Sequence, residues 1–331
     1  MPFNILSLSG GGYRGLFTIE VLSRLEQKAG KPIGQCFDLI AGTSIGGIIA
    51  IGLAMDKTAK EIREIFLEKG PKIFPKGEPA SGWLSRKVDQ FRLFTGGPKY
   101  DGTVLRATIE KIVGKDTLLG EAQTRLVIPA VNMTKGSVQI FKTPHSSGVV
   151  VDLHRKAVDV AMATSAAPTF FPMAKIDSSY YADGGLVANS PDACALHEAA
   201  HFCDQDISDV TLLSIGTTTT GFSLPTSLGP DLGIMQWMKN QRLMSTVMSS
   251  QQQIVDFMVG HQLRGRYMRI DAQPSNEQIV DLGLDLATPA RRDTLLGLAE
   301  GEYQKVAGSP FIQRVLTHKR AKTDFPSMFD K

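Results

Sequence analysis

The chain has 331 residues, 42% of them hydrophobic and 21% charged, which is typical of a folded globular protein with a sizeable core rather than a disordered one. The formal net charge of +3 at pH 7 argues against a protein that binds nucleic-acid polymers, because basic residues then dominate a face or a domain. Three scattered cysteines form neither a disulfide framework nor a C-x-x-C pair, which indicates a reducing compartment such as the cytoplasm.

The N-terminal part of the chain repeats a pattern of strand, glycine turn and helix. Residues 3–9 are a short apolar run without the features of a signal peptide and predict a buried strand, and residues 16–25 have apolar side chains at helical spacing. Residues 36–41 predict a second strand, 42–47 a tight turn and 48–55 a second helix. Two successive units of this kind predict a mostly parallel sheet.

Further strands are predicted at residues 125–132, 137–142, 180–182, 210–215 and 266–270, with helical stretches between most of them. We therefore expect the α/β class, with a mostly parallel central sheet and helices on both faces.

Two segments are less regular. Residues 70–102 are rich in Gly, Pro and Lys but also contain aromatic side chains, and we hypothesise that Trp83, Leu84 and Phe94, with nearby cations, form a mobile cover or a membrane contact. A locally packed excursion is the alternative. Residues 234–258 have an apolar, methionine-rich stripe at helical spacing, which predicts a core-facing helix, with an adaptable binding or membrane surface as the alternative.

The first chemical motif is the glycine-rich loop at residues 10–15 (GGGYRG), between a predicted strand and a predicted helix. It also matches G-x-G-x-x-G, but a dinucleotide site needs an acidic residue at the end of the second strand. Asp38 lies instead near the beginning of that strand, which argues against NAD or FAD. The alternative use of Gly10, Gly11 and Gly12 is to present backbone N–H groups to an oxyanion.

The second motif, residues 42–46 (GTSIG), is a G-x-S-x-G nucleophile elbow between a predicted strand and a predicted helix. Such a turn projects the hydroxyl of Ser44 above the sheet, and the small residues Gly42 and Gly46 leave space for it.

A serine hydroxyl needs a base at neutral pH. Asp183 follows the predicted strand at residues 180–182, and Gly184 and Gly185 permit close approach to its carboxylate. Burial of that carboxylate would raise its pKa toward the working range of a general base. D-G-G alone is usually a turn, so this motif is informative only in combination with the others.

The sharpest competing motif is residues 197–201 (HEAAH), which match the H-E-x-x-H signature of zinc hydrolases. In that interpretation His197 and His201 are metal ligands and Glu198 is the base. A third protein ligand in a recognised pattern is missing, so the zinc hydrolase remains an alternative.

In combination, the motifs resemble those of the patatin-like phospholipase family. The resemblance rests on residues 10–15, 42–46, 163–171 (ATSAAPTFF) and 183–185 in this order, and it extends through residues 212–217, about two thirds of the chain. Many relatives have Asn-Asn-Pro where this chain has Asn-Ser-Pro at residues 189–191, which leaves the catalytic assignments unaffected.

The family resemblance implies a patatin-like three-layer fold, with residues 1–220 as the catalytic domain. Residues 221–331 would be a helical and strand region that completes the same domain and includes a regulatory surface. It also implies a Ser-Asp dyad without histidine, in which Ser44 is the nucleophile, Asp183 is the base and Arg14 lies with the glycine loop beside the oxyanion. The expected substrate is an acyl ester of a membrane glycerophospholipid, cleaved through an acyl-enzyme with no metal or other cofactor required.

The compact length and residues 12–17 (GYRGLF) also resemble bacterial patatin phospholipases that act as cyclic-nucleotide-activated effectors in anti-phage signalling. This second resemblance implies activation by a cyclic dinucleotide such as cyclic GMP-AMP and peripheral action at the inner membrane from the cytoplasm. A homo-oligomer is an open alternative to a monomer, because the sequence does not determine the oligomeric state. A constitutive lipid-turnover esterase would have the same catalytic motifs, so that alternative stays open.

Overall fold

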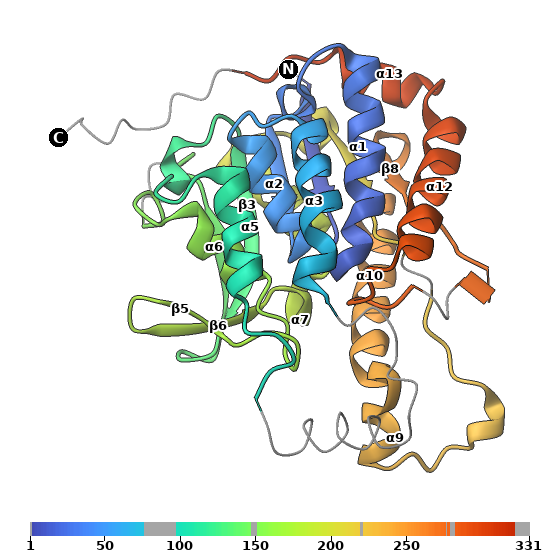
Figure 1. The fold of residues 1–331 in the computed structure, drawn as a ribbon. Coiled ribbons are helices and arrows are strands. Elements are labelled where there is room, and N and C mark those ends of the chain that lie inside the picture. Colours follow the sequence, from blue (N-terminus) through green and yellow to red (C-terminus); the bar gives the residue numbers. More distant parts are fainter. Residues whose placement is uncertain are drawn as a thin grey trace.

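The computed structural model describes residues 2–75, 97–146, 151–218, 221–275, 277–278 and 282–321. Within these ranges the protein has an eight-stranded sheet of order β5-β6-β3-β2-β1-β7-β8, with β4 paired to β3 beside this path (Figure 1). The strands are β1 (Phe3–Leu8), β2 (Leu39–Gly42), β3 (Arg125–Asn132), β4 (Ser137–Lys142), β5 (Ala174–Ile176), β6 (Ser179–Asp183), β7 (Val210–Ile215) and β8 (Tyr267–Ile270).

The centre of the sheet is parallel, as predicted. β1 pairs in parallel with β2 and β7, β2 pairs with β3, and β7 pairs with β8. The strands β4, β5 and β6 are antiparallel to their neighbours, and β5 was not predicted. Because β1, β2 and β7 run in one direction, the loops at their carboxyl ends lie together at one edge, where ligands bind in α/β sheets.

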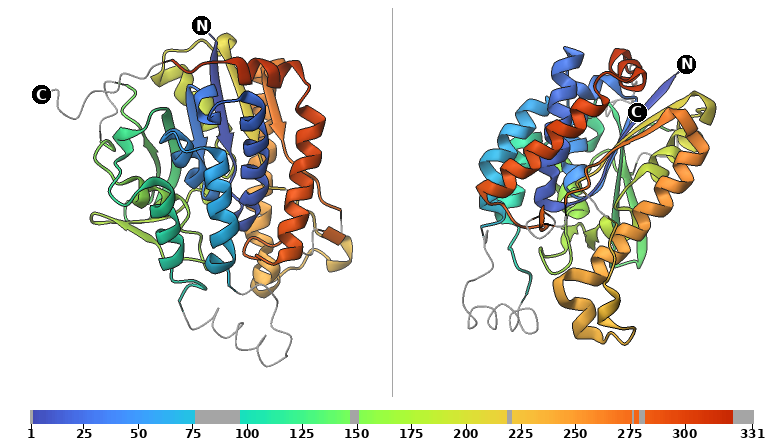
Figure 2. Two further views of the ribbon diagram at one scale, coloured as in Figure 1. Left: turned by 45° about the horizontal axis from the view of Figure 1, so that its top comes forward. Right: turned by 90° about the vertical axis from the view of Figure 1, so that its right-hand side faces the viewer.

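Helices cover both faces of the sheet (Figure 2). The main helices are α1 (Gly15–Ala29), α2 (Ile45–Ala54), α3 (Ala59–Ile73), α5 (Thr103–Val113), α6 (Ala157–Thr164), α7 (Gly185–Ala188), α8 (Asp192–Phe202), α9 (Ile234–Met238), α10 (Arg242–Leu263), α12 (Pro289–Val306) and α13 (Pro310–Thr317).

The side chains of β1 contribute to two separate cores. Leu6 and Leu8 pack into the larger core, to which α1, α2, α5 and α12 contribute, whereas Phe3 and Ile5 pack with apolar residues of α8 and α10. Successive side chains of a strand point to opposite faces, so this division produces a three-layer α/β fold. The predicted fold class is therefore confirmed.

The C-terminal third contributes to the same sheet and layers. β8 extends the sheet beyond β7, and α12 packs against α1. The division of the chain near residue 220 stays a prediction. Among the described helices, none combines the length and the hydropathy needed to cross a membrane.

The prediction of one core-facing helix over residues 234–258 is wrong. The segment forms α9 and α10, separated by a short 3-10 turn in which Gln241 has a positive φ of 58°. Ile234, Met235 and Met238 of α9 are exposed, and Val259 and Leu263 are the apolar side chains of α10 that are fully buried. The break turns the two halves of the apolar stripe in different directions, so a single inward face cannot form.

Candidate active site

Ser44 lies in the turn between β2 and α2 and has a backbone conformation that L-residues rarely adopt, with φ of 55° and ψ of −124°. The turn is tight enough to require glycine on both sides. A Cβ atom at position 42 would lie 2.2 Å from the carbonyl oxygen of Gly46, and one at position 46 would lie 2.3 Å from the carbonyl oxygen of Leu8. These contacts give the G-x-S-x-G spacing a steric reason.

The hydroxyl of Ser44 donates a hydrogen bond to Asp183, with 2.7 Å between Oγ and Oδ2. Asp183 is the last residue of β6, and its other oxygen, Oδ1, accepts a 2.6 Å bond from the Gly185 N–H. Burial raises the pKa of Asp183 to about 6, and the hydrogen bonds from Gly185 and Ser44 oppose this rise. A carboxylate with this pKa is ionised at neutral pH and is more basic than an exposed aspartate.

The glycine loop lies beside Ser44 at the end of β1. Gly11 and Gly12 line the same pocket as Ser44, and their N–H groups have no protein acceptor within the described ranges. The N–H groups on either side, of Gly10 and Tyr13, are already donated to backbone carbonyls at 2.9 and 2.8 Å. The loop therefore leaves two adjacent donors available to a developing negative charge.

Arg14 has a different position from the one expected. Its guanidinium donates to the carbonyl oxygens of Gly11 and Thr218, at 3.5 and 3.4 Å, and it does not line the pocket. Burial lowers the pKa of Arg14 to about 10, an effect that the charge of Asp271 opposes. Arg14 thus supports the backbone of the glycine loop from outside the pocket and is not placed to contact the reacting oxygen.

The pocket above Ser44 has a volume of about 100 Å³ and mostly apolar walls. Most of its large apolar side chains come from α2, α3 and the residue after it, α5, the segment 165–171 and α10: Ile45, Ile48, Phe66, Ile73, Phe74, Leu105, Phe170, Phe171, Met244 and Met248. Leu186 of α7 and Leu284 complete the apolar wall. Phe74 packs against Tyr100 and Phe171, with ring centroids 5.6 and 6.1 Å apart. Such walls fit a hydrocarbon chain whose ester lies at Ser44.

The residues hypothesised to form a cover or membrane contact, Trp83, Leu84 and Phe94, lie outside the described residues. Phe74, from the same aromatic-rich segment, is described and lines the pocket.

The two competing motifs have other roles in the structure. Both oxygens of Glu198 accept hydrogen bonds from Lys142 at 2.8 Å, and His145 also contacts this carboxylate. The rings of His197 and His201 contact each other at a tilted angle, and no cluster of three metal-ligating side chains is found among the described residues. Asp38 accepts the Asn4 N–H at the start of β1, far from the glycine loop. The site gives no support to the zinc or dinucleotide alternatives.

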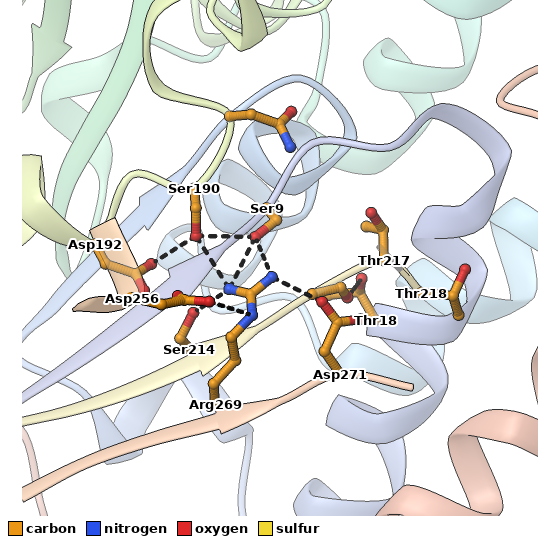
Figure 3. A network of polar contacts seen from close by, with 12 residues as sticks. Ser9, Thr18, Ser190, Asp192, Ser214, Thr217, Thr218, Asp256, Arg269 and Asp271 are labelled. Atoms are coloured by element: carbon orange, nitrogen blue, oxygen red, sulfur yellow. Dashed lines mark hydrogen bonds and ion pairs between the residues drawn. The ribbon is translucent and has the colours of Figure 1, made fainter. Parts of the chain in front are cut away.

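Sequence reasoning missed a buried arginine beneath the glycine loop (Figure 3). Arg269 of β8 donates to the hydroxyls of Ser214 and Ser190 at 2.8 and 3.0 Å and to the carboxylate of Asp271 at 2.8 Å. The hydroxyl of Ser9 lies 3.4 Å from the same guanidinium. Ser9 precedes the glycine loop, and Ser190 follows the segment that begins at Asp183. The Arg269 side chain thus connects the segment that contains the glycine loop to the segment that contains Asp183.

A second missed feature connects α10 to the segment after Asp183. Gln251 donates to the Leu186 carbonyl at 2.9 Å and accepts from the Asn189 N–H at 3.1 Å. Asn189 is buried in the pocket wall, and its Oδ1 has no hydrogen-bond partner within the described residues. Gln251 belongs to no motif that could have identified it in the sequence, and Asn189 was noted only as part of Asn-Ser-Pro, without a role.

Comparison with known proteins finds a matching family, similar relatives and a similar solved structure. The family model for "Patatin-like phospholipase" matches residues 6–192. The chain is 38% identical over 320 residues to a "cGAMP-activated phospholipase" of Pseudomonas aeruginosa, covering 96% of this chain and 92% of that protein. It is also 38% identical over 327 residues to a "cGAMP-activated phospholipase" of Vibrio cholerae, covering 91% of each. Among solved structures, human GIVD cytosolic phospholipase A2 matches with a TM-score of 0.49 and 11% identity over 96% of this chain and 61% of that chain.

Proposed function

Because the chain belongs to the patatin-like phospholipase family, we propose that it hydrolyses the fatty-acyl esters of membrane glycerophospholipids with Ser44 as nucleophile and Asp183 as general base. The observation that supports these roles is the 2.7 Å hydrogen bond between the Ser44 hydroxyl and the Asp183 carboxylate at the wall of an apolar pocket. Histidine is not needed, because the carboxylate itself is within hydrogen-bonding distance of the proton to be moved.

The reaction proceeds through an acyl-enzyme in two halves. Asp183 takes the Ser44 proton as Oγ attacks the ester carbonyl carbon, and the resulting oxyanion accepts hydrogen bonds from the Gly11 and Gly12 N–H groups. The carbon–oxygen bond then breaks, and the departing lysolipid oxygen receives the proton from Asp183. In the second half, Asp183 takes a proton from water, whose oxygen attacks the acyl carbon, and Ser44 regains a proton as the fatty acid leaves. No step uses a metal or an organic cofactor.

The test is fatty-acid release from phosphatidylglycerol and phosphatidylethanolamine vesicles by the wild type, Ser44→Ala and Asp183→Asn, with and without EDTA. We expect both substitutions to reduce release by roughly three orders of magnitude or more, the size seen when nucleophile or base is removed, and EDTA to have no effect. Asp116→Asn, which removes an exposed carboxylate paired with Lys156, is the matched control. Retained hydrolysis in Ser44→Ala would overturn the assignment.

The proposed activator is a cyclic dinucleotide such as cyclic GMP-AMP. The two bacterial relatives whose names specify cGAMP activation match more than nine tenths of this chain, so the similarity extends beyond residue 192, where the family model ends. A shared C-terminal third is expected if that region binds or responds to the nucleotide. In this interpretation the enzyme acts peripherally on the cytoplasmic face of the inner membrane during anti-phage defence.

Adding a panel of cyclic dinucleotides to the vesicle assay tests the activator. Hydrolysis that rises at least roughly tenfold with one nucleotide, the low end of the range for an allosteric coupling, supports the effector role. Full hydrolysis without any nucleotide would instead identify a constitutive lipid-turnover esterase.

A further inference from the structure

Four apolar side chains at the junction of α9 and α10 are exposed together. Ile234, Met235 and Met238 of α9 are 82%, 61% and 54% exposed, and Leu243 in the first turn of α10 is 46% exposed. We call these four residues the tip patch. Large apolar residues scattered singly on a surface are normal, but four within ten residues of chain form a concentrated patch. Methionine suits a surface that must adapt to an irregular partner.

The tip patch adjoins, along the chain, residues that line the active-site pocket. Gln241, Met244 and Met248 line the pocket, and Leu243 of the tip patch lies between the first two of them in the sequence. The α9 end of α10 extends beyond the carboxyl edge of the sheet, the edge at which the Ser44 turn lies (Figures 1 and 2). The same helix end therefore has one side in the pocket and another in solvent.

Contacts on the inner side of α10 fix its position relative to the site. Gln251 bonds two backbone groups of the segment that follows Asp183, and Tyr267 of β8 donates to Asp256 of α10 at 2.8 Å. These contacts position α10 relative to the site, and the tip patch lies in the first turn of α10 and in α9, which contacts α10.

We propose that the tip patch docks on the surface of a phospholipid bilayer and sets the pocket mouth against it. This inference rests on the proposed function, because a substrate whose acyl chains lie in a bilayer must pass from that bilayer into the pocket. Exposed apolar side chains enter the boundary between headgroups and acyl chains, while cations such as the neighbouring Lys239 and Arg242 contact anionic headgroups. Because the start of α10 contributes both to the patch and to the pocket wall, docking at the patch shortens the passage of the acyl chain through water.

Binding is tested with the full chain carrying Ser44→Ala, so that the vesicles are not consumed. We compare co-sedimentation with phosphatidylcholine vesicles containing phosphatidylglycerol for this parent and for Met235→Gln/Met238→Gln in the same background. Replacing two inserting side chains by glutamine should weaken binding by roughly tenfold or more.

The matched control is Ile254→Gln/Phe257→Gln, which removes two equally exposed apolar side chains (54% and 64%) from the other part of α10. Binding by the control should stay within about twofold of the parent, the scatter expected of a surface change outside the contact. Parent-like binding by the tip variant, or equal losses in both variants, would overturn the proposal. If the tip variant binds vesicles like the parent but has a different molecular mass by analytical ultracentrifugation, the patch would instead contact a second copy of the chain.

Hydrolysis separates this inference from the proposed function. With Ser44 intact, and with cyclic GMP-AMP present and absent, the tip variant should hydrolyse p-nitrophenyl butyrate in solution like the wild type but vesicles roughly tenfold less. Equal loss on both substrates would mean that the patch shapes the site itself and would overturn docking. A wild type that hydrolyses neither substrate contradicts the proposed function, while the co-sedimentation result still decides the docking surface.

Discussion

The buried carboxyl of Asp183 predicts the pH dependence of the reaction. Its pKa of about 6 means that the base is protonated below this pH and ionised above it. We expect kcat/KM for a soluble short-chain ester to rise with pH through about 6 and then to level off, because the free enzyme needs the carboxylate to accept the Ser44 proton. A rise centred near pH 4, the ordinary range of an exposed aspartate, would show that Asp183 is not desolvated in solution.

The same raised pKa predicts a stability effect of Asp183→Asn. Burial disfavours the charged form, so the folded protein binds a proton more tightly than the unfolded chain, and the resulting free-energy penalty is absent below about pH 4 and complete above about pH 6. The difference between the pKa of about 6 and the ordinary pKa of an aspartate corresponds to roughly 3 kcal/mol. Asn can still accept from the Gly185 N–H, so Asp183→Asn should unfold at higher urea concentration than the wild type at pH 7.5. At pH 4 the two midpoints should nearly coincide, and a variant less stable than wild type at both pH values would contradict this account.

The sequence identifies residues of the site when their chemistry depends on neighbours in the chain. Ser44 and Asp183 were found because each lies beside glycines in the sequence. Close backbone packing at both positions requires those glycines. Arg269 and Gln251 were not found, because their roles depend on serines and backbone groups far along the chain. Arg14 was placed beside the oxyanion by its position in the motif, and only the path of the chain at Thr218 shows where its guanidinium lies.

The glycine loop between β1 and α1 depends on close backbone packing as well as on conformation. Gly12 has φ of 59°, and a Cβ atom there would lie 2.2 Å from the carbonyl oxygen of Leu284. Gly12→Ala should displace the loop and its N–H donors, and we expect roughly a hundredfold or greater loss of kcat, comparable to removal of one oxyanion donor.

Gly30, at the end of α1, is a matched control for Gly12. It has a similar φ of 66°, but nothing lies within 4 Å of the Cβ position. Gly30→Ala should lower the free energy of unfolding by roughly 1 kcal/mol through left-handed strain alone and leave kcat unchanged. If both variants lost the same activity, the effect at Gly12 would result from left-handed strain and not from displacement of the glycine loop.

Strands were predicted more accurately than the helical stripe at residues 234–258. Three predicted strands, β3, β4 and β7, have the observed limits. For β3 and β7 the reason is that short apolar runs inside a sheet have few alternative positions, whereas β4 is a half-exposed strand that pairs only with β3. The apolar spacing over α9 and α10 correctly indicated helix, but it could not reveal the turn at Gln241 or which side faces solvent. The turn and the solvent-facing side depend on the pocket, whose walls come from many separate parts of the chain.

The buried charge network shows how the sheet and the site are held as one unit. Arg269 lies among Asp271, Asp256 and the hydroxyls next to the two catalytic segments, and the surrounding carboxylates raise its pKa despite the burial. Tyr267 joins Asp256 of α10 to Asp192 at the start of α8, with bonds of 2.8 and 2.9 Å. Helices on one face of the sheet are thereby connected to the loops that contain the reacting groups.

Arg269→Met tests this connection. Removing the guanidinium leaves buried carboxylates without compensation, so we expect the free energy of unfolding at pH 7.5 to fall by roughly 3–5 kcal/mol. The uncompensated carboxylates of the variant should have raised pKa values, so the loss should shrink as the pH falls and they become protonated. Arg106→Met removes an arginine that is half exposed and also pairs with two carboxylates, and it should cost about 1 kcal/mol or less with little dependence on pH. Urea midpoints of both variants at pH 5 and 7.5 measure the difference. If Arg269→Met were no more destabilising than Arg106→Met, the network would not be what holds the glycine loop and the Asp183 segment together.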